Sequence, residues 1–223
     1  IQRTFPLVST FYGKEDYTFH ELNSDFIATV DLFLKTEAGL CRNTIVRYMK
    51  CFKRITNMAL AKEWMRKDPF YGYKMAQDET DPVFLTYPEL KSIMEKEFTI
   101  PRLALVRDIF VFAAFTGLAF ANVSTLTKDN LVQDNNGDWW IRKGRVKLER
   151  RHRASSVCNI PMLPVPLAIL KKYEEHPICR KKSLCLPVIC NQRMNSYLKE
   201  IADLCNIRKN LTTHTAKHSK IYI

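Results

Sequence analysis

The sequence lacks any long hydrophobic run, internal repeat or low-complexity segment. No apolar stretch among the 223 residues approaches the roughly 18 residues that a membrane-spanning helix requires, and nothing at the N-terminus resembles a secretory signal. The composition, with 46% apolar and 26% charged residues, is ordinary for a folded globular protein and argues against extensive disorder. We therefore expect one large domain or two modest ones, with no membrane partner.

Paired cysteine motifs are also missing. The seven cysteines are odd in number and show none of the short repeated spacings of a disulfide scaffold, which indicates reduced thiols in a cytoplasmic protein. His176, Cys179, Cys185 and Cys190 lie near one another in the sequence, but they lack the CxxC spacing of a zinc knuckle. We predict no metal site.

Acidic residues are scarce relative to basic ones. The chain has 23 Asp and Glu against 35 Lys and Arg, a formal net charge of +12. Such an excess indicates a polyanionic partner, either nucleic acid or an anionic membrane surface. Because no membrane segment is evident, nucleic acid is the expected partner.

The first part of the chain has the pattern of a helical domain. Apolar residues recur at helical spacing over residues 20–36, and a second helix is expected after a cap at Asn43 or Thr44. One face of this second helix is apolar. Its other face carries Asn43, Arg47, Lys50 and Arg54. Two prolines, a glycine and a local reversal of charge interrupt the pattern at residues 68–82, where we place a domain boundary.

The second part combines helices with a short β-structure. Thr86 and Glu89 form a capping-box pattern, and Pro101 begins a strongly apolar helix. The spacing of apolar residues then changes from a helical one over residues 130–160, where an Asn-Gly turn separates segments typical of strands. Further helices are expected over residues 164–174 and 191–205 and near the C-terminus. The predicted fold class is mainly α with a small antiparallel β-sheet.

The densest positive charge lies in the predicted hairpin. Seven basic residues fall within twelve positions: Arg142, Lys143, Arg145, Lys147, Arg150, Arg151 and Arg153. A single acid, Glu149, lies among them, so pairing within the run cannot neutralise it, and contact with phosphate is favoured over a solvated hairpin tip. We expect DNA contacts from two groups: Arg42, Asn43, Thr44, Arg47 and Lys50 in the first domain, and Arg142, Arg145 and Arg151 in the hairpin.

Four motifs together carry a family resemblance. They are FTGLAFANVSTLT at 115–127, NIPML at 159–163, NQRMNSYLKEIADLCNI at 191–207 and LTTHTAKHS at 211–219. In order and spacing they resemble the tyrosine recombinases, specifically the integrases of conjugative and mobilisable elements within the phage-integrase family. The resemblance implies a SAM-like core-binding domain over residues 1–72 without its first helix, a linker over 73–84, and a catalytic domain over 85–223 that lacks C-terminal segments.

The resemblance also implies a definite activity. In this family a tyrosine attacks a DNA phosphodiester, leaves a 3′-phosphotyrosine and a free 5′-hydroxyl, and a second strand reverses the attack, so that a mobile element is integrated or excised. No metal, ATP or other cofactor is required. The implied partners are double-stranded DNA at a recombination site or junction, further copies of the chain in a dimer or tetramer, and accessory DNA-bending proteins, in a bacterial cytoplasm. Such chemistry needs a deprotonated phenol, fixed cations around the phosphate and a general acid for the leaving oxygen.

Several residues match the family's motifs. His214 matches the first histidine of its HxxR motif, and His218 follows where HxxRH is common. Lys147 matches the lysine that acts as general acid. Two alternatives stay open for the hairpin: Lys143 is the catalytic lysine by a shift of register, or Lys147 is a plain DNA contact.

Three positions depart from the family's pattern. Ala119 stands where the first arginine of the family usually lies, Asn122 where an acidic residue follows, and Lys217 where the second arginine lies. Lysine keeps the charge but loses the two-pronged guanidinium geometry, and the sequence does not settle whether this lysine is natural or engineered. Arg107 is the nearest substitute for the missing first arginine, yet about 18 Å of helix separates it from Ala119. The alternative for Arg107 is a structural ion pair with Asp108.

Alternatives also remain for the nucleophile and for the activity of the chain. Tyr222 follows the HxxR segment too closely for the family's pattern, so it is either the nucleophile beyond missing residues or an ordinary tyrosine. The three departures at Ala119, Asn122 and Lys217 favour a non-catalytic DNA-binding protein of the same fold as the rival to a recombinase. A type IB topoisomerase, which needs no core-binding domain of this kind, is a third reading.

Overall fold

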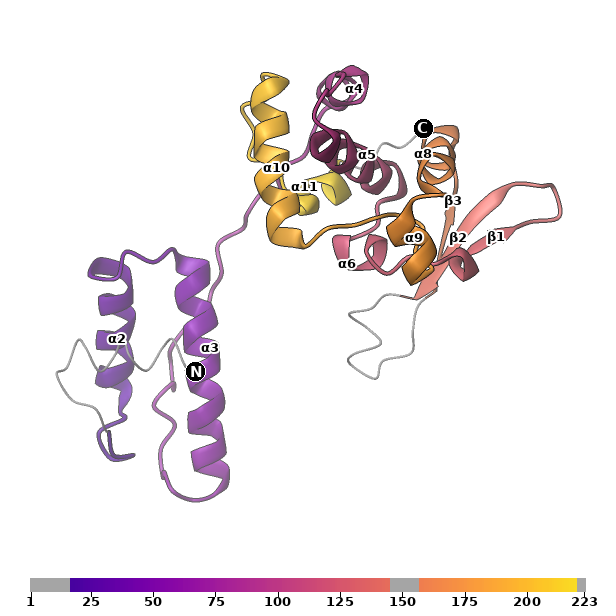
Figure 1. The fold of residues 1–223 in the computed structure, drawn as a ribbon. Helices are drawn as coiled ribbons and strands as arrows, with labels where there is room; N and C mark the ends of the chain where they lie inside the picture. The colour runs from indigo at the N-terminus through magenta and orange to yellow at the C-terminus, as the bar shows by residue number, and fades with distance from the viewer. Residues whose placement is uncertain (1–16, 145–156, 220–223) are drawn as a thin grey trace. The chain divides into compact units, whose positions relative to one another are not determined.

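A computed structural model describes residues 17–144 and 157–219. The chain divides into two compact units, Ile1–Thr80 and Asp81–Ile223, which are considered separately (Figure 1). The division falls inside the segment that the sequence marks as a linker. Among the described residues no helix is both long and apolar enough to cross a membrane.

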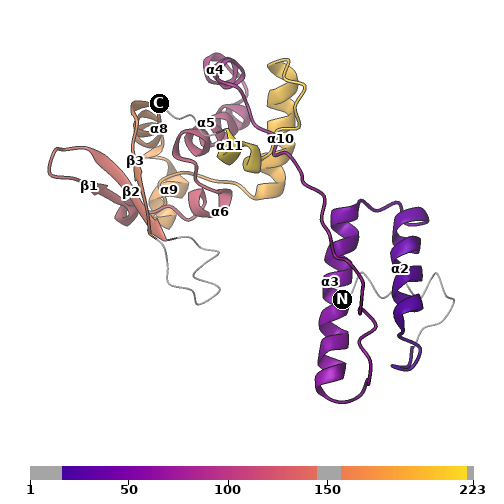
Figure 2. The same ribbon diagram turned by 180° about the vertical axis from the view of Figure 1, so that it is seen from behind.

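Unit 1 is a helical hairpin followed by an extended segment. Helices α2 (Ser24–Thr36) and α3 (Arg42–Ala61) lie side by side, and the chain then returns along α3 (Figures 1 and 2). The side chain of Asn23 caps α2 by accepting a hydrogen bond from the backbone N–H of Phe26 at 2.9 Å. The core of the unit consists of Phe26, Ile27, Val30, Leu34, Ile45, Met49 and Phe70.

The start of α3 differs from the sequence-based expectation. The helix begins at Arg42, with Cys41 in the N-cap position and no side-chain hydrogen bond from that cap. Asn43 and Thr44 therefore lie inside the first turn, and neither is the cap. The expected apolar stripe is present, with Ile45, Met49 and Ala59 buried against the rest of the unit.

Unit 2 is built around one buried helix, α5 (Pro101–Thr116), which begins at a proline and ends at Gly117 in the left-handed conformation (φ 65°). Because α5 is apolar over most of its surface from Leu103 onward, it lies at the centre of the unit. The surrounding helices are α4 (Tyr87–Glu95), α6 (Phe120–Val123), α8 (Pro164–Tyr173), α9 (Pro177–Lys182), α10 (Asn191–Leu204) and α11 (Thr213–His218). Of these, α4, α8, α10 and α11 contact α5. The capping box predicted for α4 is present, since Thr86 N–H donates to Glu89 Oε2 at 2.7 Å.

A three-stranded antiparallel sheet lies at the edge of unit 2. Its strands are β1 (Leu131–Gln133), β2 (Trp139–Gly144) and β3 (Val157–Pro161), in the order β1-β2-β3. Leu131 pairs with Ile141, and Ile141 pairs in turn with Ile160 on the other side. Ile141 is fully buried and anchors the sheet to the core. The predicted Asn-Gly turn joins β1 to β2, with Gly137 at φ 88°. The mainly helical fold with a small antiparallel sheet is thus confirmed.

Candidate functional site

Helix α11 presents the three basic residues of the HxxR-like motif on one surface. His214, Lys217 and His218 are exposed, whereas Thr215 and Ala216 are buried toward the core. Thr212 caps the helix: its side chain accepts a hydrogen bond from Thr215 N–H at 3.3 Å, and Thr215 Oγ1 accepts one from Thr212 N–H at 3.2 Å. The spacing of three and four residues therefore places the basic groups together, as the sequence predicts.

The two histidines of α11 are in direct contact. Their Nε2 atoms are 3.0 Å apart, and their rings meet edge to face with centroids separated by 4.5 Å. One neutral imidazole can donate to the other in this geometry, so the contact fixes the ring of each. The exposed ammonium of Lys217 on the same helix adds a positive charge to this surface.

The junction between α5 and α6 lies close to α11. Ala119 occupies the N-cap position of α6, two residues after the left-handed Gly117. A small apolar pocket is lined by residues of α5, α6, α10 and α11, among them Phe120 and Ala216. The fold therefore brings α6, whose N-cap is Ala119, close to α11. The methyl group of Ala119 offers no donor to an anion there.

Arg107, the predicted substitute for the missing arginine, makes its hydrogen bonds within the protein. Its Nη1 donates to the backbone carbonyls of Met94 at 3.0 Å and Lys96 at 2.9 Å, and its Nε donates to Asp108 Oδ1 at 2.5 Å. These bonds tie the end of α4 to α5, far along the helix from Ala119. The Nε and Nη1 of Arg107 are thus engaged by the protein itself, which supports the structural alternative for this residue, while its catalytic role stays a prediction.

The hairpin residues are only partly within the described ranges. Arg142 is exposed on β2, and Lys143 Nζ donates to Thr125 O at 2.5 Å and Asn130 Oδ1 at 3.0 Å. These contacts anchor the Lys143 ammonium at the base of the sheet. The other predicted residues, Lys147, Arg145 and Arg151 in the hairpin and Tyr222 near the C-terminus, lie outside the described residues.

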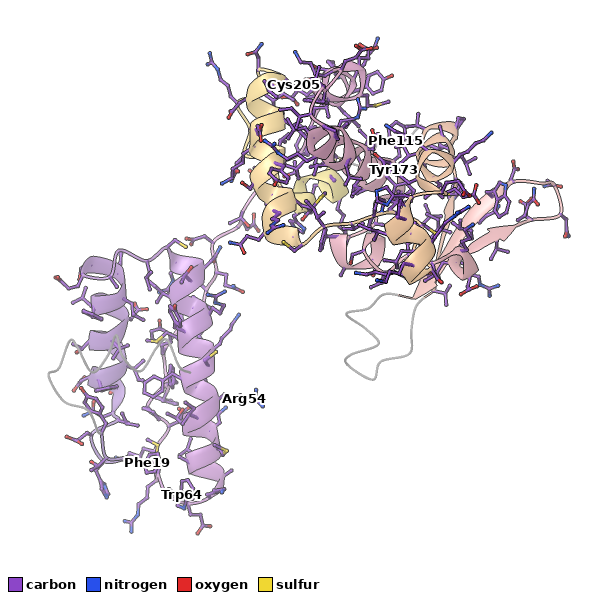
Figure 3. All side chains as sticks on the ribbon, viewed as in Figure 1. Phe19, Arg54, Trp64, Phe115, Tyr173 and Cys205 are labelled. Carbon is purple, nitrogen blue, oxygen red and sulfur yellow. The ribbon has the colours of Figure 1, made fainter. Side chains whose placement is uncertain are left out.

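The basic face of α3 is exposed in its middle. Arg47, Lys50 and Arg54 are solvent-accessible, and Arg54 projects from α3 on the side away from α2 (Figure 3). These residues lie three or four positions apart and form one strip of the helix. Thr44 is half-buried, with its Oγ1 3.2 Å from the sulfur of Cys41.

At the start of α3, the predicted DNA contacts bind the protein's own chain. Arg42 Nη2 donates to Lys74 O at 3.0 Å and its Nε to Ala76 O at 3.3 Å. The side chain of Asn43 bonds both the N–H and the C=O of Asp78, each at 2.9 Å. These bonds fasten residues 74–78, which we call the strap, along α3.

A half-buried carboxylate anchors the base of the strap. Asp31 accepts hydrogen bonds from Arg42 Nη1 at 3.1 Å and from the hydroxyl of Tyr73 at 2.5 Å. Burial, together with the Asp31 carboxylate, raises the pKa of Tyr73 to about 12. Sequence reasoning missed Asp31 and Tyr73, because they are separated by 42 residues and form no local motif.

Comparison with known proteins gives one family-model match and several similar solved structures. Residues 1–75 match the model of the phage integrase SAM-like domain. No curated protein sequence matches the chain. Solved structures do match: a lambda integrase(75-356) dimer bound to a COC′ core site has a TM-score of 0.71 at 12% identity, covering 94% of this chain and 73% of that one.

Two further solved structures have a fold similar to that of this chain. The XerH site-specific recombinase, in a post-cleavage complex with a palindromic difH substrate, has a TM-score of 0.61 at 17% identity, covering 88% of this chain and 57% of that one. The Tn1549 transposon integrase (aa 82-397), in complex with circular intermediate DNA, has a TM-score of 0.63 at 18% identity, covering 88% and 70%. The chain thus spans little more than half the length of the XerH chain. Residues 1–75 carry a phage integrase SAM-like domain, and the chain as a whole has the fold of the tyrosine recombinases, as its motifs indicate.

Proposed function

We propose that this chain is a site-specific DNA recombinase that cuts and rejoins strands through a 3′-phosphotyrosine intermediate, to integrate or excise a mobile element. The observation that carries the proposal is the joint exposure of His214, Lys217 and His218 on α11, beside the α5–α6 junction, in a chain with the recombinase fold. Three adjacent nitrogen donors on one surface suit a phosphodiester, whose non-bridging oxygens gain negative charge during attack.

The proposed reaction assigns one task to each group. A tyrosine oxygen, after losing its proton to solvent, forms a new O–P bond, the bond from phosphorus to the 5′-oxygen breaks, and a general acid gives a proton to that oxygen. His214 and Lys217 donate to the non-bridging oxygens. Lys147 is the proposed acid, and Tyr222 the proposed nucleophile. Lys217 supplies a point charge where a guanidinium would bind two oxygens at once, so we expect slow cleavage from this chain.

The proposed DNA surface comprises both units. In unit 1 the exposed strip of Arg47 and Lys50 is the main contact, with Arg42, Asn43 and Thr44 at its end; in unit 2 the hairpin contributes Arg142, Arg145 and Arg151. The net charge of +12 supports a polyanionic partner. The similar lambda integrase structures contain a dimer on a core site and a tetramer on a Holliday junction. By analogy we propose duplex DNA as the substrate and a dimer or tetramer as the working form.

A non-catalytic DNA-binding protein of the same fold is the second candidate. Ala119 favours it, because the side chain at this position cannot bind phosphate, and Asn122 and Lys217 also depart from the family's pattern. The two candidates make the same prediction for DNA binding but opposite predictions for covalent chemistry.

A nicked suicide substrate separates the two functions. When the chain and its Lys217→Arg variant are mixed with this DNA, a recombinase forms a covalent adduct that survives denaturation, and the Lys217→Arg variant forms it faster. Tyr222→Phe should remove the adduct while leaving DNA affinity unchanged. If neither the parent chain nor Lys217→Arg forms an adduct while both bind DNA, the non-catalytic function is correct. If Tyr222→Phe still forms one, peptide mapping of the adduct identifies the true nucleophile.

A further inference from the structure

Helix α11 is too short to hold its own orientation. It contains six residues, whereas an isolated helix of fewer than about 12 residues is marginal in water. A rotation by one residue turns a helix through about 100°, which would move His214 and Lys217 off their common surface. The direction in which these groups point must therefore be set by contacts from the rest of unit 2.

The N-terminal end of α11 is held by two asparagines of α10. The backbone N–H of Thr213 donates to Asn195 Oδ1 at 2.9 Å, and Thr213 Oγ1 donates to Asn191 Oδ1 at 2.8 Å. Asn191 and Asn195 are four positions apart and so lie on the same face of α10. The first N–H groups of a helix have no acceptor within that helix. Asn195 supplies an acceptor to one of them, the N–H of Thr213.

The C-terminal end of α11 is held by a different element. The buried Ser219 Oγ donates to Thr215 O at 2.8 Å and accepts from the backbone N–H of Leu85 at 2.7 Å. Two clamps therefore act on a helix of less than two turns, one at each end. Of the two, the asparagine clamp bonds Thr213, the residue directly before His214.

We propose that Asn195 and Asn191 are positioning residues of the recombination reaction. By fixing both the backbone and the hydroxyl of Thr213, they set the rotation of α11, so that His214 and Lys217 face the scissile phosphate. This inference rests on the proposed recombinase function. Neither asparagine touches the phosphate, and each acts through an oxygen that accepts a hydrogen bond.

The acceptor role provides a specific pair of variants. Asn195→Leu keeps the size of the side chain but removes the acceptor, whereas Asn195→Asp keeps an oxygen in the same place. We expect Asn195→Leu to slow single-turnover adduct formation about 10- to 100-fold, since small misplacements of catalytic groups have effects of this order. Asn195→Asp should retain most of the rate. Ser196→Ala, at the neighbouring exposed position of α10, is the matched control.

The readout must distinguish positioning from general damage. DNA affinity and the thermal unfolding midpoint should stay near the parent values in Asn195→Leu while the cleavage rate falls. The proposal is overturned if Asn195→Leu cleaves at the parent rate, if Asn195→Asp is as slow as Asn195→Leu, or if affinity and stability fall in step with the rate. Should Asn195→Leu fail to fold, Thr213→Val, which removes the hydroxyl donor, is compared with Thr213→Ser, which keeps it, under the same criteria.

A second measurement is independent of catalysis. NMR of the imidazole groups reports the contact between His214 and His218, and hydrogen exchange reports the Thr213 amide. We expect Asn195→Leu to speed this exchange and to change both imidazole signals, and Ser196→Ala to do neither. If no variant forms an adduct but these signals change, the proposed recombinase function fails and the clamp on α11 stands. If the signals do not change, the clamp itself is refuted.

Discussion

The hydroxyl of Tyr173 on α8 donates a hydrogen bond to Asp108 Oδ2 on α5 at 2.8 Å, in the interior of unit 2. Lys172 binds the same oxygen at 2.7 Å, and Arg107 binds the other one. Figure 3 shows Tyr173 between α8 and α5. Burial and the Asp108 carboxylate raise the pKa of the Tyr173 hydroxyl well above its usual range, which keeps it a donor. One carboxylate thus joins α5 and α8, and it binds Arg107, which in turn bonds the end of α4.

Asp108→Ala should be strongly destabilising. It leaves the Nε of the half-buried Arg107 and the Tyr173 hydroxyl without an acceptor, and breaking a buried charged pair in this way costs about 3–5 kcal/mol. Urea denaturation checks the expected decrease in the free energy of unfolding. The control concerns Arg102, which lies on α5 like Asp108 and pairs with the exposed Glu200 of α10. Glu200→Ala should cost no more than about 1 kcal/mol. Equal losses in the two variants would contradict the role of Asp108.

The Tyr73 hydroxyl makes unit 1 sensitive to alkali. Its pKa is raised from 10.0 to about 12 by burial first and by Asp31 second. The folded state therefore holds this proton more tightly than the unfolded state, so the stabilisation is fully present below pH 10 and is lost as the pH rises toward 12. Tyr73→Phe should remove the corresponding late step from a spectrophotometric titration of tyrosinate. An unchanged titration curve would show that another tyrosine produces that step.

Asn43 should control the strap over residues 74–78. Asn43→Ala removes both hydrogen bonds to Asp78, and we expect hydrogen exchange at the Asp78 amide to become much faster. Asn57→Ala is the control, because Asn57 is exposed farther along the same helix. If exchange at Asp78 is unaffected by Asn43→Ala, the other contacts of the strap are sufficient to hold it.

Arg47 should contribute to DNA binding through phosphate. Arg47→Ala is expected to reduce the slope of log K against log [salt] by about 1, because one fewer counterion is released per contact. Lys35→Ala removes an exposed charge from α2 instead and should leave the slope unchanged. Fluorescence anisotropy over a series of salt concentrations measures both. Equal slopes for Arg47→Ala and the parent chain would remove Arg47 from the interface.

Local patterns predicted the local structure well. The capping box at Thr86, the proline that begins α5 and the Asn-Gly turn each depend on residues a few positions apart, and each is present as expected. The grouping of His214, Lys217 and His218 follows from helical periodicity alone. At Cys41 the same reasoning failed, because the polar residues Asn43 and Thr44 resemble a cap although the helix begins before them.

Long-range partners could not be predicted from such patterns. Two acceptors of Arg107 are backbone carbonyls, which leave no mark in the sequence. Arg42, a predicted phosphate contact, likewise donates to backbone carbonyls of the strap. In both cases a basic residue satisfies the protein's own carbonyl groups, and only the fold identifies the acceptor.

The bond between Ser219 and Leu85 has a consequence for the order in which the molecule is made. The two residues are separated by 134 positions, so the ribosome releases Leu85 long before Ser219 exists. Unit 1 ends at Thr80 and can fold during synthesis, since domains generally fold as units from the N-terminus. α11 docks only after nearly all of the described chain has been made. A nascent chain therefore displays the basic strip of α3 before it possesses the histidine pair.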